Sequence, residues 1–223
     1  INQMFLSDKP ALAKYNLQDC MLVSRIFDKT HLLDFAIERS CLTGIELDKI
    51  GGSVAAFTNL YLPQLHRSGY IAPNMHSEDW VASPGGYVMD SLPNLYDSVI
   101  VLDYKSLYPS IIRSFLIDPL GLIEGLRLPI GTNSQSAIEG FRGGQFHRQH
   151  HFLPKMIESI WQARERAKNN KNHAVSQALK IIMNSFYGVL GSSGCRFFDT
   201  RLASSITMRG HEIMKVTKRL IEE

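Results

Sequence analysis

The sequence has little cysteine and no long apolar run. Its three cysteines, Cys20, Cys41 and Cys195, lie far apart and form no C-x-x-C pair. This odd number and wide spacing suit a reduced cytoplasm better than a disulfide framework. No run of about eighteen apolar residues occurs, so we expect no membrane-spanning helix. The N-terminus lacks the cationic lead and apolar core of a secretory signal, so we expect a soluble, cytoplasmic protein.

A strong excess of one charge is also absent. The formal net charge is +3 and the isoelectric point is about 8.7. This weakly basic balance permits a polyanionic partner without requiring one. Hydrophobic residues make up 44% of the 223 residues, which is enough for a sizeable core in one or two domains. The chain begins with Ile1 rather than methionine, and we expect it to be a segment of a longer protein.

The spacing of apolar residues predicts a mostly helical chain. Helical spacing covers residues 10–40, 51–67, 154–168, 174–187 and 203–223. Residues 169–172 supply a turn, so the third and fourth of these helices are expected to form an antiparallel hairpin. Glycine and proline break every period in residues 68–94, which predicts a linker, and residues 120–151 are expected to be irregular.

One apolar run predicts a strand. Residues 99–102 are rich in β-branched side chains and predict a buried strand that ends at Asp103. Pro109 then indicates a turn that opens a helix. A carboxylate between a buried strand and a helix N-terminus combines a hard metal ligand with N–H groups that can hold phosphate. From its position alone, Asp103 could equally be a solvated acid at the end of a strand.

The segment that starts at this carboxylate has a recognisable pattern. Residues 103–110 read DYKSLYPS and fit D-x-x-S-L-Y-P-S, which is motif A of the family B DNA polymerases, and the chain resembles that family. The resemblance implies that Asp103 coordinates catalytic Mg²⁺ and that the backbone of Ser106 and Leu107 contacts a triphosphate. It also implies that Tyr108 is a steric gate, because a bulky ring can exclude a ribose 2′-hydroxyl. The alternative for Tyr108 is an ordinary core residue.

A second segment fits motif B of the same family, K-x-x-x-N-S-x-Y-G. It covers residues 180–188, and helical periodicity puts Lys180, Asn184 and Tyr187 on one face. The resemblance implies that Lys180 is catalytic and binds the incoming triphosphate, with Asn184 and Tyr187 lining the nucleotide site. The alternative is an amphipathic helix with one solvated lysine.

The preceding helix carries a pair of cations four residues apart, Arg164 and Lys168. The family's fingers domain has an R-x-x-x-K pair at this place, so the resemblance implies that both residues bind nucleotide opposite Lys180. Fixed cations that neutralise triphosphate charge are the main protein contribution to phosphoryl transfer beside Mg²⁺ and positioning. The alternative is a charged, solvated helix face.

Near the N-terminus, Tyr15 and Asp19 fit Y-x-x-x-D, which resembles the last motif of the family's 3′→5′ exonuclease. By that resemblance Asp19 is a metal ligand and Tyr15 orients a water. The spacing is common in helices, and its place ahead of motif A is what favours this interpretation. The D-x-E pair of such exonucleases is absent, since residues 46–48 read E-L-D in the reverse order.

Three further positions are expected to contact DNA. Residues 83–88 resemble the family's template-contacting Y-x-G-G segment, with Ser83 in place of the first tyrosine. Gly85 and Gly86 still permit close approach of the backbone to a strand of DNA. Arg196 is a candidate primer or template contact, with core packing as the alternative for its segment.

Two other groups of residues could bind a metal or phosphate, but each also has an ordinary structural explanation. His147, His150 and His151 could bind a metal, but no cysteine or acid supports them, and a loop near nucleic acid is favoured. Lys215, Lys218 and Arg219 form either a phosphate-binding face or a solvated one.

No D-T-D sequence, the family's motif C, occurs in the chain. Two-metal phosphoryl transfer needs acidic ligands from at least two places to hold ions about 4 Å apart. Asp103 alone cannot supply acidic ligands from two places. We therefore expect the chain to be a segment that is inactive alone, with motif C soon after Glu223.

These observations predict an α+β fold. It comprises part of a polymerase palm with an antiparallel sheet, a helical-hairpin fingers domain and the last helices of an exonuclease domain. The expected boundaries are 1–68 for the exonuclease end, 69–95 for a linker, 96–152 and 191–223 for the palm, and 153–190 for the fingers.

The implied activity is template-directed DNA synthesis from dNTPs on a primer 3′-hydroxyl, with two Mg²⁺ ions. Residues 177–210 look nearest to bacterial repair polymerases, which implies a nucleoid-associated protein. The expected partners are primer–template DNA and dNTP, with a sliding clamp through regions that this chain lacks. The alternative is a non-catalytic nucleic-acid-binding module.

Overall fold

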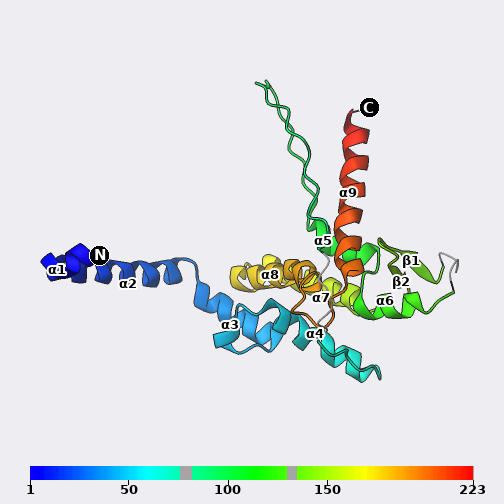
Figure 1. Cartoon of the computed structure of the whole chain (residues 1–223), viewed down its shortest axis with the longest axis horizontal. Helices are drawn as coiled ribbons and strands as arrows, with labels where there is room; N and C mark the ends of the chain where they lie inside the picture. The colour runs from blue at the N-terminus through cyan, green and yellow to red at the C-terminus, as the bar shows by residue number, and fades with distance from the viewer. Residues whose placement is uncertain (76–81, 130–134, 223) are drawn as a thin grey trace.

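The computed structural model describes residues 1–75, 82–129 and 135–222. Parts of the predicted linker and of the predicted irregular region, residues 76–81 and 130–134, lie outside the described residues, as does Glu223. A helical body carries three projections (Figure 1). The N-terminal helices extend to one side, while helix α9 and the chain that leads into helix α5 rise together from another. Within the described part of the chain, no helix is long and apolar enough to cross a membrane.

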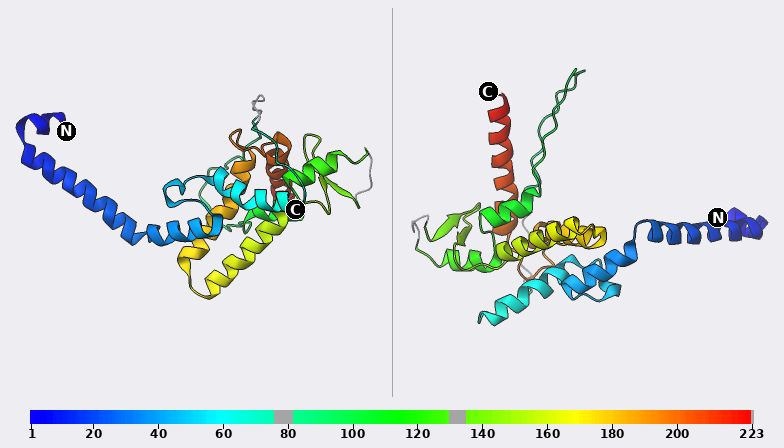
Figure 2. Two further views of the ribbon diagram at one scale, coloured as in Figure 1. Left: turned by 90° about the horizontal axis from the view of Figure 1, so that it is seen from below. Right: turned by 180° about the vertical axis from the view of Figure 1, so that it is seen from behind.

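The predicted helices in the first third of the chain are present. They are α1 (Asn2–Ser7), α2 (Lys9–Lys29), α3 (Leu32–Thr43), the short 3₁₀ helix η1 (Leu47–Lys49) and α4 (Ser53–Arg67). The Asp8 carboxylate accepts a hydrogen bond from the Ala11 N–H at 3.0 Å and caps α2. Helix α2 has no buried residue and stands away from the body in every view (Figures 1 and 2). Hydrogen bonds of its own backbone maintain α2 as a helix, and it buries no side chain against the body.

The body is built by the remaining helices. These are α5 (Leu107–Ser114), α6 (Pro119–Leu126), α7 (Leu153–Asn169), α8 (His173–Leu190) and α9 (Thr200–Glu222). Helices α7 and α8 form the predicted antiparallel hairpin, and the Asn172 side chain caps α8 by accepting from the Val175 N–H at 3.1 Å. The hairpin follows from local periodicity and a local turn, which is why the sequence predicts it well.

The core lies where α4, α5, α7 and α8 meet. Phe57 stacks on Tyr61 with ring centroids 5.2 Å apart, and the edge contact of Phe57 with Phe186 joins α4 to α8. Ile112 from α5 and Ile157 from α7 are fully buried in the same cluster. Burying apolar side chains of this size contributes about 1.5–3 kcal/mol each, so this cluster fixes how the helices pack.

The predicted strand at residues 99–102 is wrong. Val99, Ile100, Val101 and Leu102 are 67–86% exposed, and no described residue pairs with them as a strand. A β-branched run becomes a strand only when a neighbouring strand takes its N–H and C=O groups. Because such pairing is not local in sequence, the run alone could not show whether a partner is available. Asp103 therefore follows an exposed, irregular segment.

The sheet content is also smaller than expected. In the described residues the strands are β1 (Ala137–Glu139) and β2 (Gln145–His147), an antiparallel hairpin that pairs Ile138 with Phe146. It lies within the region predicted to be irregular, as does α6. Gly125 on α6 permits this packing, because a side chain there would overlap the backbone of Gln145. The chain is mostly helical, with one small antiparallel sheet.

A single buried carboxylate joins three helices. Asp118 is fully buried and accepts hydrogen bonds from the Tyr61 hydroxyl at 3.0 Å and from the N–H groups of Gly121, Phe152 and Leu153 at 2.8, 3.0 and 2.7 Å. It thereby caps α6 and α7 and ties both to α4. Burial raises the pKa of the Asp118 carboxyl above its ordinary value, and the four hydrogen bonds oppose that rise.

We expect the Asp118→Ala variant to be strongly destabilised. The substitution leaves four buried donors without an acceptor, and each unsatisfied group costs about 1–3 kcal/mol. The loss in unfolding free energy should reach at least about 3 kcal/mol in urea denaturation followed by circular dichroism. Asp48→Ala, at an exposed position, is the control and should change stability by less than about 0.5 kcal/mol. Equal stability of the two variants would contradict the role of Asp118.

Candidate active site

Residues 103–110 form a tight turn into helix α5. Ser106, the residue before the helix, has φ 54° and ψ 55°, in the left-handed region. This conformation costs a non-glycine residue about 1–2 kcal/mol, so the turn is imposed by its surroundings. The Ser106 carbonyl accepts from the Ser110 N–H at 3.0 Å, and the N–H groups of Leu107 and Tyr108 have no acceptor within the described residues. The turn therefore presents free N–H donors beside Asp103.

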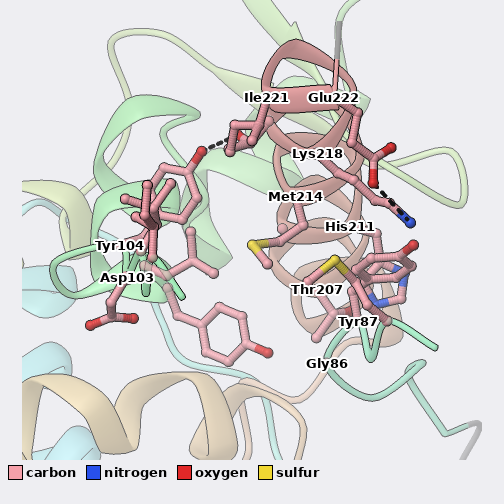
Figure 3. A pocket seen from close by; sticks show the side chains of 17 residues that line it. Gly86, Tyr87, Asp103, Tyr104, Thr207, His211, Met214, Lys218, Ile221 and Glu222 are labelled. Carbon is pink, nitrogen blue, oxygen red and sulfur yellow. Dashed lines mark hydrogen bonds and ion pairs between the residues drawn. The ribbon is translucent and has the colours of Figure 1, made fainter. Parts of the chain in front are cut away.

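Asp103 is exposed and forms no hydrogen bond or ion pair with any residue that the structure describes. Its carboxylate points away from α9 in the close view (Figure 3). A free, exposed carboxylate is suited to a hard cation such as Mg²⁺. No cluster of three or more metal-ligating side chains occurs in the described part of the chain. Asp103 thus fits one ligand position of a metal site and leaves the others to other groups.

The two predicted polymerase motifs meet through their tyrosines. The ring centroids of Tyr108 on α5 and Tyr187 on α8 are 4.6 Å apart, with the ring planes at 45°. Both rings are partly buried against the core cluster. Burial, reinforced by Tyr108, raises the pKa of the Tyr187 hydroxyl above its ordinary value. The contact makes one aromatic wall from segments far apart in sequence.

The glycine pair of the linker lies against the same wall and against α9. The Gly85 carbonyl accepts a hydrogen bond from His211 Nε2 at 2.8 Å, and Ser83 Oγ lies 3.2 Å from Thr207 Oγ1. A Cβ on Gly86 would lie 3.2 Å from the Tyr108 hydroxyl, whereas one on Gly85 would meet open space. The close approach of linker and ring therefore favours glycine at position 86, whereas position 85 has room for a side chain.

A cavity of ≈ 570 Å³ opens beside this wall, between α9 and the chain that leads into α5 (Figure 3). Asp103, Leu107 and Tyr108 line one side of it. On the α9 side, His211 lies beside Tyr87 with ring centroids 5.6 Å apart. Most of the remaining lining is apolar.

The three cations predicted to bind nucleotide lie on the α7–α8 hairpin. Lys180 is exposed and forms no ion pair with the described residues. Lys168 donates to Glu165 Oε1 at 2.8 Å, and Arg164 Nε is buried with no acceptor among the described groups. Asn184, on the same helix as Lys180, is also exposed.

The motif comparison missed a set of residues that connects α5 to α7. Trp161 lies between two cations, with Lys105 Nζ 5.6 Å and Arg113 Cζ 5.0 Å from its ring centroid. Arg113 also pairs with Glu158 on α7. Lys105 occupies a variable position of motif A, so only the fold could reveal this contact.

The other predicted site residues lie elsewhere. Tyr15 and Asp19 are exposed on α2, far from α5 (Figure 1). Arg196 lines a separate cavity of ≈ 320 Å³ with Tyr70 and Phe198. The structure does not bring these residues to Asp103.

The histidine cluster has no arrangement suited to a metal. His147 Nδ1 accepts from the N–H groups of Gln149 and His150 at 3.1 and 3.2 Å, so its lone pair is engaged. His151 is buried, and burial lowers its pKa, although Asp118 opposes the shift. On α9, Lys215 lies over the Tyr87 ring at 5.7 Å, and Lys218 pairs with Glu222 at 3.6 Å.

The fold and the motifs agree with comparisons to known proteins. The family model described as DNA polymerase family B matches residues 51–223, and the chain belongs to that family. It is 60% identical over 222 residues to DNA polymerase II of Escherichia coli (strain K12), covering 100% of this chain and 28% of that protein. The DNA polymerase delta catalytic subunit of Bos taurus is 28% identical over 230 residues, covering 95% of this chain and 21% of the subunit.

A solved structure supports the same fold. The family B DNA polymerase from the hyperthermophilic archaeon Pyrobaculum calidifontis aligns with a TM-score of 0.73 at 23% identity, covering 96% of this chain and 30% of that one. The chain thus spans less than a third of the length of each of these relatives.

We expect Gly86→Ala to be less stable than Gly85→Ala, because the added methyl group at position 86 would lie 3.2 Å from the Tyr108 hydroxyl. Overpacking of this kind costs about 1 kcal/mol or more, which urea denaturation can measure as a loss of unfolding free energy. Gly85→Ala is the matched control, since its Cβ meets nothing within 4 Å and both substitutions change the unfolded chain in the same way. Equal stability of the two variants would show that the Tyr108 side chain yields to the methyl group.

Proposed function

We propose that this chain is the central segment of a DNA-directed DNA polymerase. The observation that carries the proposal is the contact of Tyr108 with Tyr187, whose rings lie 4.6 Å apart. It unites motifs A and B in one wall next to a free carboxylate and the free N–H groups of the α5 turn. Each motif alone has an ordinary structural explanation, whereas a joint wall with these groups is suited to a nucleoside triphosphate.

In the proposed reaction, the primer 3′-oxygen attacks the α-phosphorus of a dNTP and the bond to pyrophosphate breaks. Asp103 would hold catalytic Mg²⁺, which would supply a lowered pKa at the attacking hydroxyl and offset negative charge on the phosphoryl oxygens. The N–H groups of Leu107 and Tyr108 contact the triphosphate, and Arg164, Lys168 and Lys180 offset its negative charge. These residues position the triphosphate and neutralise its charge, and they form no covalent intermediate.

Tyr108 is proposed to select the sugar. Its ring packs against Tyr187 on one side, and its hydroxyl lies next to Gly86. A ring held from two sides has little room to yield to an added 2′-hydroxyl, which is the physical requirement for excluding a ribonucleotide. Asn184 and Tyr187 then line the nucleotide site on α8, while Gly85, Gly86 and Arg196 are proposed DNA contacts.

The remaining assignments follow the family's organisation. We propose that residues 1–68 end a 3′→5′ exonuclease domain in which Tyr15 and Asp19 act, and that residues 69–95 link it to the palm. Residues 96–152 and 191–223 belong to the palm and 153–190 to the fingers. Another part of the protein supplies the second metal-binding acid, because two ions need ligands from at least two places. A bacterial cytoplasmic location near the nucleoid and a sliding-clamp partner belong to the same proposal.

We expect Asp103→Ala to abolish primer extension in the protein expressed from its complete gene. Loss of the metal-binding carboxylate should lower kcat at least about a thousandfold while primer–template binding persists. Single-turnover extension and a DNA-binding titration give the two readouts. Residual synthesis within tenfold of the unsubstituted protein would rule out the metal role. If the unsubstituted protein binds DNA but never extends a primer, the non-catalytic alternative is favoured.

Replacing Tyr108 by alanine should admit ribonucleotides. We expect the ratio of kcat/KM for dNTP over rNTP to fall by about tenfold or more, since the space taken by the ring becomes available. Tyr108→Phe keeps the ring and is the control that should retain selectivity. Unchanged discrimination in the alanine variant would remove the gate assignment.

A further inference from the structure

One carboxylate oxygen on α7 holds two ammonium groups. Glu165 Oε1 accepts from Lys168 Nζ at 2.8 Å and lies 3.7 Å from Lys105 Nζ. Lys168 is one of the cations assigned above to the triphosphate. Lys105 comes from the turn of motif A, two residues after Asp103. Glu165 therefore links helix α7 to the motif A turn, because it pairs with one lysine from each.

The surroundings keep this acid charged and accessible. The Lys168 hydrogen bond, with help from Lys105 and Arg164, lowers the pKa of the Glu165 carboxyl below its ordinary value. The Glu165 side chain is 39% exposed, so an incoming anion can reach the lysines. The Trp161 ring lies 5.6 Å from Lys105 Nζ and favours a position of that ammonium group beside α7.

We infer that Glu165 is a positioning residue that occupies Lys168 and Lys105 until the triphosphate of a nucleotide displaces it. The inference rests on the proposed function and deepens it, since it concerns how the same site recognises its substrate. A triphosphate carries several negative charges against one on Glu165, so it competes well for two lysines. A monophosphate carries about two negative charges and has fewer oxygens that can reach both lysines, so it competes less well. Glu165 thereby sets how tightly an anion that reaches both lysines is bound.

The size of the effect follows from the exposure of these groups. Exposed ion pairs of this kind are weak, so we expect at most about a two- to fivefold change in binding. Displacement of Glu165 is therefore easy for the right ligand. The contact also keeps both lysines near the site when no nucleotide is bound, so that they do not pair elsewhere.

The test is Glu165→Gln in the protein expressed from its complete gene. Glutamine keeps the size and one acceptor oxygen but removes the charge. The Kd of dNTP, measured with a primer that ends in a 3′-dideoxynucleotide, should fall about two- to fivefold, and KM should fall with it while kcat stays unchanged. Deoxynucleoside monophosphate should gain less affinity than dNTP, because removing a competitor helps a ligand only to the extent that the ligand has to displace it.

Glu124→Gln is the matched control, because Glu124 pairs with Arg127 at 2.7 Å on α6 in the same i,i+3 geometry. It should leave Kd, KM and kcat unchanged. The double variant with Lys168→Ala should show a smaller effect of Glu165→Gln than the single variant shows. An unchanged or raised Kd in Glu165→Gln would overturn the inference.

The single variant Lys168→Ala distinguishes a failure of the inference about Glu165 from a failure of the proposed nucleotide site. A rise in dNTP Kd in that variant supports the proposed nucleotide site whatever Glu165 does. If Lys168→Ala leaves Kd unchanged, the proposed site itself is wrong, and the inference falls with it.

Discussion

The Asp118 carboxylate is the interaction on which the arrangement of the body depends. It collects four donors from three helices at a fully buried position, where an unpaired donor is costly. Its bonds to Phe152 and Leu153 fix where α7 begins, and its bond to Tyr61 fixes α7 relative to α4. A helix fixed at its first turn has a defined axis, so residues further along it have defined positions as well.

The fixed axis of α7 determines the arrangement of the site through two sets of contacts. Helix α7 places Trp161 and Glu165 next to Lys105, and its hairpin partner α8 places Tyr187 against Tyr108. From the other side, α9 holds the glycine linker through His211. The turn at Ser106 thus lies among side chains and backbone from α7, α8 and the linker held by α9. These contacts explain how Ser106 keeps a left-handed backbone conformation.

The sequence predicted what depends on local physics. The hairpin of α7 and α8 and the final helix α9 follow from apolar periodicity. The short motifs proposed Asp103, Tyr108, Lys180 and Tyr187 as site residues from the sequence of each motif alone, and these roles stay predictions. The sequence failed where the outcome depends on distant partners. The run at residues 99–102 has the composition of a strand, but composition does not supply a neighbouring strand. The pairing of Lys105 with Glu165 and the preference for glycine at position 86 are likewise set by contacts between separate elements.

The exposed apolar segment at residues 99–102 has a practical consequence for handling the chain. Four adjacent side chains that are mostly solvated, with unpaired backbone groups, form a template onto which an identical segment of a second molecule can add. We therefore expect concentrated solutions of this polypeptide to self-associate through that segment. A charged residue or a proline placed among these four positions would suppress it without touching Asp103, and would ease crystallisation or spectroscopy of the isolated chain.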